Sequence, residues 1–219
     1  MNFRNKIFLE NHIEKTLSFY HPNCIDKNLG GYHHQFRDNG LIDDRITKHL
    51  VGTCRFIYIY SISFITTKKP EYQIAAEQGL KFLREFHQQP DEGFAWLLDG
   101  KKVKDDKRYC YGHAFVLLAA AVATKAQIKG AKEFISEIYE ILENNFWDEE
   151  SNLYLDEMDK GWKNISPYRG QNANMHMCEA MLSAYEATKE KRYLNRARTL
   201  ARRICLDLAK KTNGLIWEH

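Results

Sequence analysis

The segment Tyr168–Tyr185, YRGQNANMHMCEAMLSAY, places three polar side chains at helical spacing within a run rich in Met and Ala. Asn172, His176 and Glu179 stand at positions i, i+4 and i+7, so they share one face of a helix. A histidine on such a face could take or give a proton near neutral pH, and Glu179 could hold its tautomer from one turn away. The alternative is a core histidine that is hydrogen-bonded to its own helix.

Two other apolar segments also carry polar side chains. Arg55 is the one charge in the run Leu50–Ile65, LVGTCRFIYIYSISFI, and a guanidinium among apolar residues needs acceptors. It either binds substrate oxygens or forms a structural ion pair with a carboxylate. In the segment KRYCYGHAF, Tyr109, Tyr111 and His113 offer hydroxyl and imidazole groups. These aromatic residues either face a site or are core residues with a satisfied polar tip.

The sequence predicts no metal or cofactor. The pair His176-x-x-Glu179 resembles half of a di-iron pattern whose other half is missing, and YHHQ at Tyr32–Gln35 lacks ligand spacing with anything nearby. The sequence contains no GxSxG, GxGxxG or P-loop motif. The basic segment Arg192–Lys211 follows the outer face of a helix, which indicates a solvated surface.

The composition is that of a globular protein, with 219 residues of which 44% are hydrophobic and 28% charged. The net charge of +3 is too small to indicate a nucleic-acid partner. The start of the chain has no uninterrupted apolar stretch typical of a secretory signal. The run Leu50–Ile65 has 16 residues with Arg55 in its middle, so we predict a buried helix and no membrane span. Five cysteines without a CxxC pair indicate reduced thiols in a cytoplasmic protein.

An internal repeat organises the chain. Four similar segments, GGYHHQF, GFAWLLD, NLYLDE and GLIWEH, each suggest a turn followed by a short extended run. Their turn residues Gly31, Gly93, Asn152 and Gly214 are separated by 62, 59 and 62 residues. A regular period of this length is typical of repeat architectures.

Two helices are predicted in each interval, the first apolar on nearly every side and the second amphipathic. An apolar helix must be enclosed and an amphipathic one lies at a surface, so each unit is an inner helix, an outer helix and an extended loop. With an N-terminal helix at Arg4–Tyr20, the pattern predicts an all-α fold, an α/α toroid. The predicted inner helices are Arg45–Ile65, Tyr109–Ala126 and Gln171–Thr188, and the outer ones are Glu71–His87, Ala131–Phe146 and Arg192–Lys210.

The repeats supply only part of a ring. Closing such a toroid takes about six helix pairs, and repeat arrays need neighbours or caps to bury their faces. We therefore expect residues 1–219 to form a single incomplete domain, about half of an (α/α)6 barrel. Either the chain is a truncated product, or a partner chain or a second copy in a homo-oligomer completes the ring, or the chain caps itself.

The quoted motifs GGYHHQFRDNG, KHLVGTCRFIYIYS, YCYGHAFVLLAAA, YRGQNANMHMCEAMLSAYEAT and GLIWEH resemble the N-acylglucosamine 2-epimerase superfamily. Among its members, the resemblance is greatest to aldose–ketose isomerases that act on mannose-type sugars. It runs from about residue 20 to the end, and YRGQNANMH is its most specific part. The resemblance implies the N-terminal half of an (α/α)6 barrel.

The resemblance also implies a reaction and a site. Members of the superfamily move a proton on an unphosphorylated sugar, giving epimerisation at C2 or aldose–ketose isomerisation through an enediol, without a metal or redox cofactor. Arg55 is expected to stabilise the oxygen that gains negative charge, and His176 to hydrogen-bond the sugar and assist ring opening. Tyr111 and Asn172 are expected to orient hydroxyl groups, and Glu179 completes the substrate-binding set.

The same resemblance places the principal acid–base histidines of the superfamily in the second half of the barrel. We therefore expect the 219-residue chain alone to bind sugar poorly and to turn over little or nothing. Two alternatives stay open. One is a 2-epimerase acting on N-acylglucosamine or cellobiose. The other, from a different class, is a non-catalytic helical-repeat protein that binds a partner through its open concave face.

Overall fold

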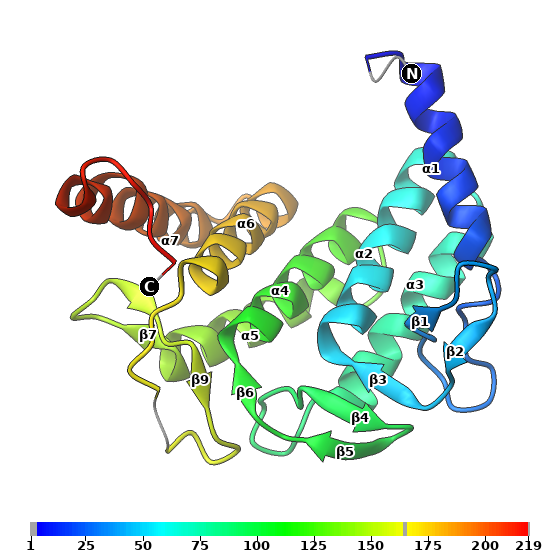
Figure 1. Ribbon diagram of the computed structural model, residues 1–219, viewed down its shortest axis with the longest axis horizontal. Coiled ribbons are helices and arrows are strands. Elements are labelled where there is room, and N and C mark those ends of the chain that lie inside the picture. The colour runs from blue at the N-terminus through cyan, green and yellow to red at the C-terminus, as the bar shows by residue number, and fades with distance from the viewer. Residues whose placement is uncertain (1–3, 164–165, 219) are drawn as a thin grey trace.

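The helices form an open arc with an inner and an outer layer (Figure 1). The computed structural model describes residues 4–163 and 166–218, and the predicted all-α half-ring is confirmed within them. Seven α-helices lie in these described residues: α1 Lys6–Tyr20, α2 Leu50–Thr67, α3 Pro70–Phe82, α4 Cys110–Lys125, α5 Ala131–Asn145, α6 Gln171–Thr188 and α7 Lys191–Arg202.

Helix α4 is the centre of the inner layer. It packs against both other inner helices, α2 and α6, and against the outer helix α5. Its sequence, CYGHAFVLLAAAVATK, is apolar on every side, and its alanines let neighbouring helices approach closely. Nearly the whole helix is therefore buried.

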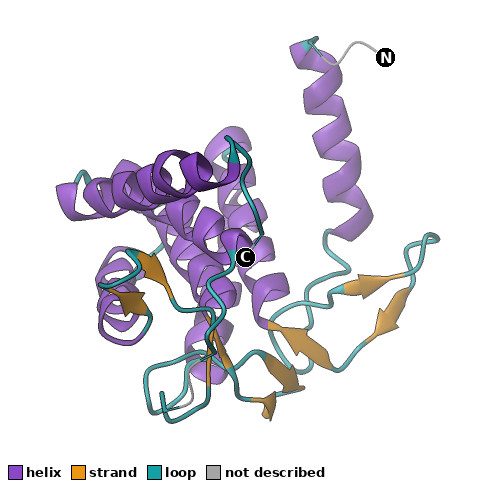
Figure 2. Cartoon of the chain, turned by 60° about the vertical axis from the view of Figure 1, so that its left-hand side comes forward, coloured by secondary structure: helices purple, strands orange, loops and turns teal. Residues whose placement is uncertain are grey.

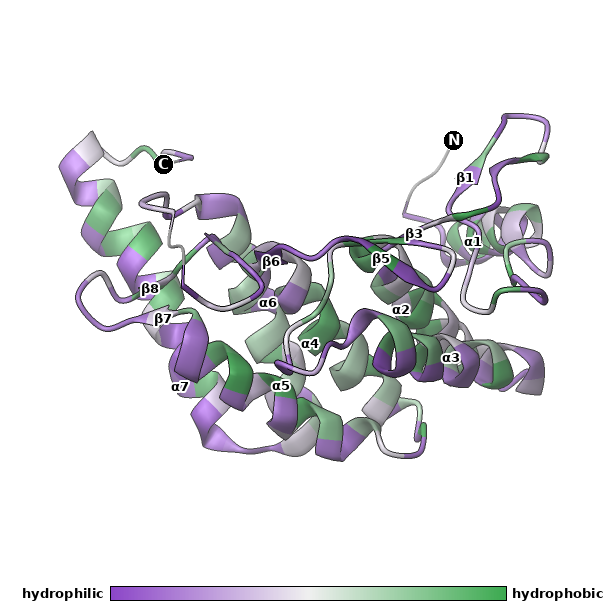
Figure 3. Ribbon diagram, turned by 90° about the horizontal axis from the view of Figure 1, so that it is seen from below, coloured by the Kyte–Doolittle hydropathy of each residue, from purple (hydrophilic) through white to green (hydrophobic). Residues whose placement is uncertain are grey.

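The outer helices α3, α5 and α7 each pack on the inner helix that precedes them. In α5 the buried residues recur at helical spacing, as in Phe134, Ile138 and Ile141. Figure 3 shows hydrophilic and hydrophobic residues alternating along α5 and α7, whereas α4 is largely hydrophobic or neutral. These two patterns are the outer and inner characters that the repeat predicts.

Short strands gather at one end of the helices (Figure 2). Strand β4 lies between β3 and β5 in an antiparallel sheet, while β1 pairs with β2, β6 with β9, and β7 with β8. The β3–β4 and β6–β9 pairings join the loops of successive repeats, whereas the other pairs each lie within one loop. The strands are β1 Gln35–Phe36, β2 Ile42–Asp44, β3 Thr47–His49, β4 Leu97–Asp99, β5 Lys102–Asp105, β6 Arg108–Tyr109, β7 Trp147–Asp148, β8 Leu153–Tyr154 and β9 Glu157–Met158.

The helix boundaries differ from prediction mainly where strands intervene. Helix α6 has the predicted bounds, but α2 begins at Leu50, because residues 47–49 pair with β4. Lys48 in that strand is fully buried, and its ammonium group donates to Asp26 at 2.7 Å. The fourth repeat segment, after Gly214, forms no strand in its described part, and its last residue, 219, lies outside the described residues.

Wide π-helical turns continue the outer helices α3 and α7 beyond their ends. They span Leu83–His87 and Arg203–Leu208. A 3₁₀ turn, Ala209–Thr212, follows the second of them. The predicted outer helices therefore continue as helical turns of a different pitch.

Two inner helices are less enclosed than predicted. Exposed apolar side chains include Ile59 and Ile62 of α2, and Met175 and Leu182 of α6. The expectation that every inner helix is enclosed is wrong for these two, because each has an inner-helix neighbour, α4, on one side. Helix α2 is long and apolar enough to cross a membrane by length and composition, but it packs between α3 and α4.

Candidate active site

Side chains from the three inner helices meet on the concave face of the arc. The Arg55 guanidinium of α2 donates from Nη2 to the Tyr111 hydroxyl of α4 at 3.4 Å. The Tyr111 ring packs edge-on against the His176 imidazole of α6, with ring centroids 5.2 Å apart. Residues far apart in the sequence therefore share one surface, as the repeat requires.

Phe115 packs against two members of this cluster. It lies one helical turn after Tyr111, and its ring is 5.0 Å from the Arg55 guanidinium carbon and 4.9 Å from the His176 ring centroid. Cation–π attraction holds Arg55 over the ring. Arg55, Phe115 and His176 also line a hollow of about 270 Å³ that reaches Cys54 and Glu179, whereas Tyr111 is not among its lining residues. The sequence analysis missed Phe115, although its spacing from Tyr111 puts both on one face.

Glu179 orients the His176 imidazole. The Glu179 carboxylate lies 3.0 Å from Nδ1 of His176, so the neutral ring carries its proton on Nδ1 and donates it to Glu179. Nε2 is then left as an acceptor. The His176 side chain is 22% exposed while that of Glu179 is 55% exposed. This arrangement suits a histidine that accepts a proton from a ligand in the concave face.

The exposure of Arg55 differs from the sequence-based expectation. A lone arginine in an apolar helix was expected among apolar residues, yet Arg55 is exposed. It stands on the face of α2 that looks onto the open concave side, so water as well as Tyr111 satisfies its donors. A structural ion pair for Arg55 is not among the contacts of the described residues.

The two asparagines of the NANMH motif lie in different environments. Asn172 is exposed in the first turn of α6, on the His176 face. Asn174 is fully buried, accepts from the Tyr154 N–H at 2.8 Å, and donates to the carbonyls of Tyr154 and Gly170 at 3.2 and 3.0 Å. Asn174 therefore fastens the start of α6 to β8, a role that helical spacing alone does not reveal.

His113 belongs to the core. It is fully buried, its Nδ1 donates to the Tyr109 carbonyl at 2.7 Å, and its Nε2 accepts from the Phe94 N–H at 3.2 Å. Burial lowers the pKa of His113 to about 3, so the ring stays neutral. Of the two interpretations open for this residue, the geometry matches the structural one.

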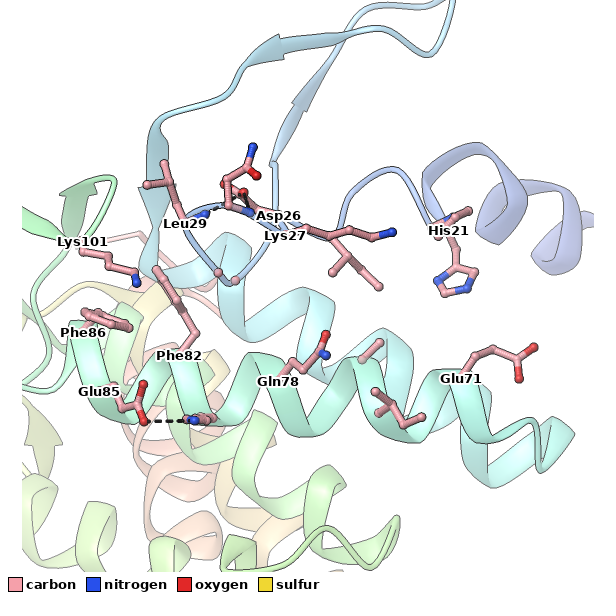
Figure 4. Close-up of a pocket in the computed structure, with 18 residues that line it drawn as sticks. His21, Asp26, Lys27, Leu29, Glu71, Gln78, Phe82, Glu85, Phe86 and Lys101 are labelled. Carbon is pink, nitrogen blue, oxygen red and sulfur yellow. Dashed lines mark hydrogen bonds and ion pairs between the residues drawn. The ribbon is translucent and has the colours of Figure 1, made fainter.

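A second hollow lies outside the concave face. It has a volume of about 790 Å³ and runs between helix α3 and the loop 21–31 (Figure 4). Glu71 and Gln78 of α3 and Glu85 of the following π-helical turn line one side, and Lys27 lies on the other. None of the five predicted site residues lines it, so its volume does not make it the catalytic candidate.

A metal site has no support in the coordinates of the described residues. Across residues 4–163 and 166–218, no group of three or more His, Cys, Asp or Glu side chains could hold a metal ion. The side chains that meet on the concave face are a guanidinium, a phenol and an imidazole–carboxylate pair.

Comparison with known proteins places this site in a family. The sequence model of N-acylglucosamine 2-epimerase matches residues 30–219, most of the chain. The chain belongs to the N-acylglucosamine 2-epimerase family. The predicted resemblance is therefore confirmed, and the half-ring is this family's α/α architecture.

Named relatives within the N-acylglucosamine 2-epimerase family include isomerases and epimerases. The D-mannose isomerase of Marinomonas mediterranea is 46% identical over 218 residues, which is 99% of this chain and 55% of that protein. The cellobiose 2-epimerase of Dictyoglomus turgidum is 30% identical over 190 residues, covering 81% of this chain and 48% of that protein. The chain thus spans about half the length of these relatives.

A solved member of the family has the same backbone. The crystal structure of a D-mannose isomerase superposes with a TM-score of 0.97 and 45% identity, covering all of this chain and 56% of that one. At this similarity, the two proteins share the backbone framework that includes α2, α4 and α6.

Proposed function

We propose that this chain provides the sugar-binding half-site of an aldose–ketose isomerase that interconverts D-mannose and D-fructose. The observation that carries the proposal is the meeting of Arg55, Tyr111 and His176, from three inner helices, on one concave surface. The similarity to D-mannose isomerases supports the choice of sugar.

The reaction begins with ring opening. Nε2 of His176 accepts the proton of the anomeric hydroxyl, because Glu179 already occupies Nδ1. The bond between C1 and the ring oxygen breaks, the ring oxygen takes this proton from His176, and the open-chain aldose results. The His176 imidazole is thereby a catalytic group, and Glu179 fixes its tautomer.

Isomerisation then moves one proton between neighbouring carbons. A base takes the proton from C2, O1 gains negative charge, and an enediol forms. The carbon-bound proton is returned to C1, O1 takes up the proton that O2 gives up, and C2 becomes the carbonyl of the ketose. The Arg55 guanidinium is the group that stabilises the charge on O1, and Tyr111 and Asn172 orient the remaining hydroxyls.

In our proposal, the base that takes the proton from C2 comes from outside this half-ring. The family resemblance supports this, because it places the principal acid–base histidines in the second half of the barrel. A completing half-ring docks against the exposed apolar side chains of α2 and α6, such as Ile59 and Leu182. The chain alone is then nearly inactive. The five cysteines are free thiols, which fits action in the reducing cytoplasm.

A complementation assay tests the proposal. The chain is co-expressed with the part of the Marinomonas mediterranea enzyme that it does not match, and D-mannose conversion to D-fructose is followed by NMR in D₂O. We expect conversion with deuterium at C1 or C2. Arg55→Ala and His176→Ala should each lower kcat/KM by about 100-fold or more.

A matched control variant is Arg37→Ala. Arg37 is a surface arginine paired with Asp43, so its loss should leave the rate within about two-fold. Full activity in Arg55→Ala or His176→Ala would refute the assigned site. Conversion of cellobiose but not of D-mannose would instead make the protein a 2-epimerase. Binding of a protein partner without any sugar turnover would favour the non-catalytic alternative.

A further inference from the structure

Three aromatic residues form a shelf beside the site. The His49 ring centroid is 4.3 Å from that of Trp96, and Trp96 is 4.6 Å from Tyr109. We call His49, Trp96 and Tyr109 the aromatic shelf. All three are partly exposed, so each ring keeps some surface open to solvent.

The aromatic shelf is continuous with the candidate active site. Trp96 lies 6.5 Å from Tyr111, measured between ring centroids, in an edge-to-face arrangement. Tyr111 in turn contacts both Arg55 and His176. Tyr111 therefore lies between the aromatic shelf and the Arg55–His176 pair.

Backbone pairing holds the aromatic shelf rigid. His49 ends β3 and pairs with Leu97 of β4, the residue directly after Trp96. The Trp96 carbonyl accepts from the Leu50 N–H at 3.0 Å, which ties the shelf to the first turn of α2. The ring of Trp96 lies over Gly112, where a Cβ would come within 3.2 Å of it. Groups on paired strands hold a ligand more accurately than groups on free loops.

His49 presents a fixed hydrogen-bond donor. Its Nδ1 accepts from the Val51 N–H at 3.2 Å, which caps helix α2, so the neutral ring carries its proton on Nε2. Burial, and then the nearby charge of Arg55, lower the pKa of His49. The neutral tautomer is therefore the form present at pH 7, with Nε2–H free for a ligand oxygen.

We propose that the aromatic shelf binds the C4–C6 end of the hexose whose C1–C2 end lies at Arg55 and His176. A sugar ring has an apolar face of C–H groups and an edge of hydroxyls. The C–H face packs on the Trp96 indole, and a hydroxyl accepts from Nε2 of His49. This assignment rests on the proposed function and makes Trp96 and His49 substrate-positioning residues.

Saturation-transfer NMR on the full chain tests the aromatic shelf, since it detects weak binding without turnover. The probes are D-mannose and D-lyxose, which is D-mannose without C6. In the wild type we expect the strongest saturation of D-mannose at H5 and H6. Trp96→Leu should lower that signal by about three- to ten-fold, the size of an aromatic contact, and change D-lyxose by less than two-fold. Trp217→Leu, at an exposed tryptophan outside the shelf, is the matched control.

His49→Asn separates the donor from the helix cap. Asparagine still accepts from the Val51 N–H, so the thermal melt should stay close to that of the wild type, while D-mannose saturation falls about three-fold. Equal losses for both sugars, or no loss at H5 and H6 in Trp96→Leu, would overturn the shelf. Absence of any saturation in the wild type, or saturation unchanged by Arg55→Ala, would refute the proposed function itself.

Discussion

At the scale of single residues, the polar groups of helix α6 divide between binding and support. His176 and Glu179 face the concave side, whereas Asn174, two residues before His176, faces the loop that carries β8. The spacing in the sequence identifies the first pair because both lie on one helical face. It does not identify Asn174, because its partners are backbone groups of Tyr154 and Gly170.

Replacing Asn174 should therefore cost stability. Asn174→Ala leaves two backbone groups of Tyr154 and the Gly170 carbonyl without their side-chain partner in a buried place. We expect the free energy of unfolding to fall by about 2–3 kcal/mol, measured from the urea midpoint. Asn172→Ala, at an exposed position in the same motif, should change it by less than about 0.5 kcal/mol. Equal effects of the two substitutions would contradict the division of roles.

At the scale of helices, close approach between elements decides which small residues matter. Gly79 lies in the middle of α3, where alanine normally stabilises a helix by about 1 kcal/mol. A Cβ at Gly79, however, would lie 2.0 Å from the hydroxyl oxygen of Tyr32. That hydroxyl donates to the Ala75 carbonyl at 2.7 Å, and the tyrosine is 1% exposed.

Gly79→Ala should thus destabilise the protein, although alanine has a higher helix propensity than glycine. Tyr32 must move away from Ala75 and disturb its buried packing, so we expect a net loss of about 2 kcal/mol in unfolding free energy. Gln78→Ala, at the exposed neighbouring position, is the control, because it changes the same helix without a clash. It should change the free energy of unfolding by less than about 0.5 kcal/mol. A more stable Gly79→Ala protein would show that the loop bearing Tyr32 yields easily.

The elements also show how far periodicity predicts this fold. The apolar period of α6 predicted both of its ends correctly, since no strand intervenes directly before or after this helix. The start of α2 was predicted too early, because residues 47–49 pair with β4, a strand distant in sequence. Because of the same error, His49, which we propose to position the substrate, was not considered as a site residue. It was assumed to lie inside the helix, whereas it precedes the first helical residue. Propensity alone cannot resolve pairings between distant segments.

At the scale of the whole molecule, the repeat predicted the arc because each unit must bury its inner helix against the next. It also predicted that Arg55, Tyr111 and His176 come from successive inner helices. It could not predict which side chains face the concave surface, since rotation of each helix is set by contacts such as Phe115 with both Arg55 and His176. Family membership, given by the match to residues 30–219, adds the reaction class to the proposal.

The stability of the whole molecule should fall as the pH is lowered below neutrality. His87 and His113 are fully buried, and burial is the main cause that lowers their pKa values to about 4 and about 3. An unfolded histidine has a pKa of about 6.5, so the unfolded chain binds protons that the folded chain refuses. Stability from these two rings is therefore complete above about pH 6.5 and lost progressively toward their folded pKa values.

Between pH 7 and pH 5, each of these two histidines should lower the free energy of unfolding by about 2 kcal/mol, because one pKa unit corresponds to about 1.4 kcal/mol. Urea midpoints measured at both pH values give the drop directly. His113→Gln has no imidazole to protonate, so we expect it to be less stable than the wild type at pH 7 but to lose less between pH 7 and pH 5. If the variant loses as much as the wild type over that interval, protonation of His113 does not drive the acid sensitivity, and carboxylate pairs such as Asp26 with Lys48 become the cause to examine.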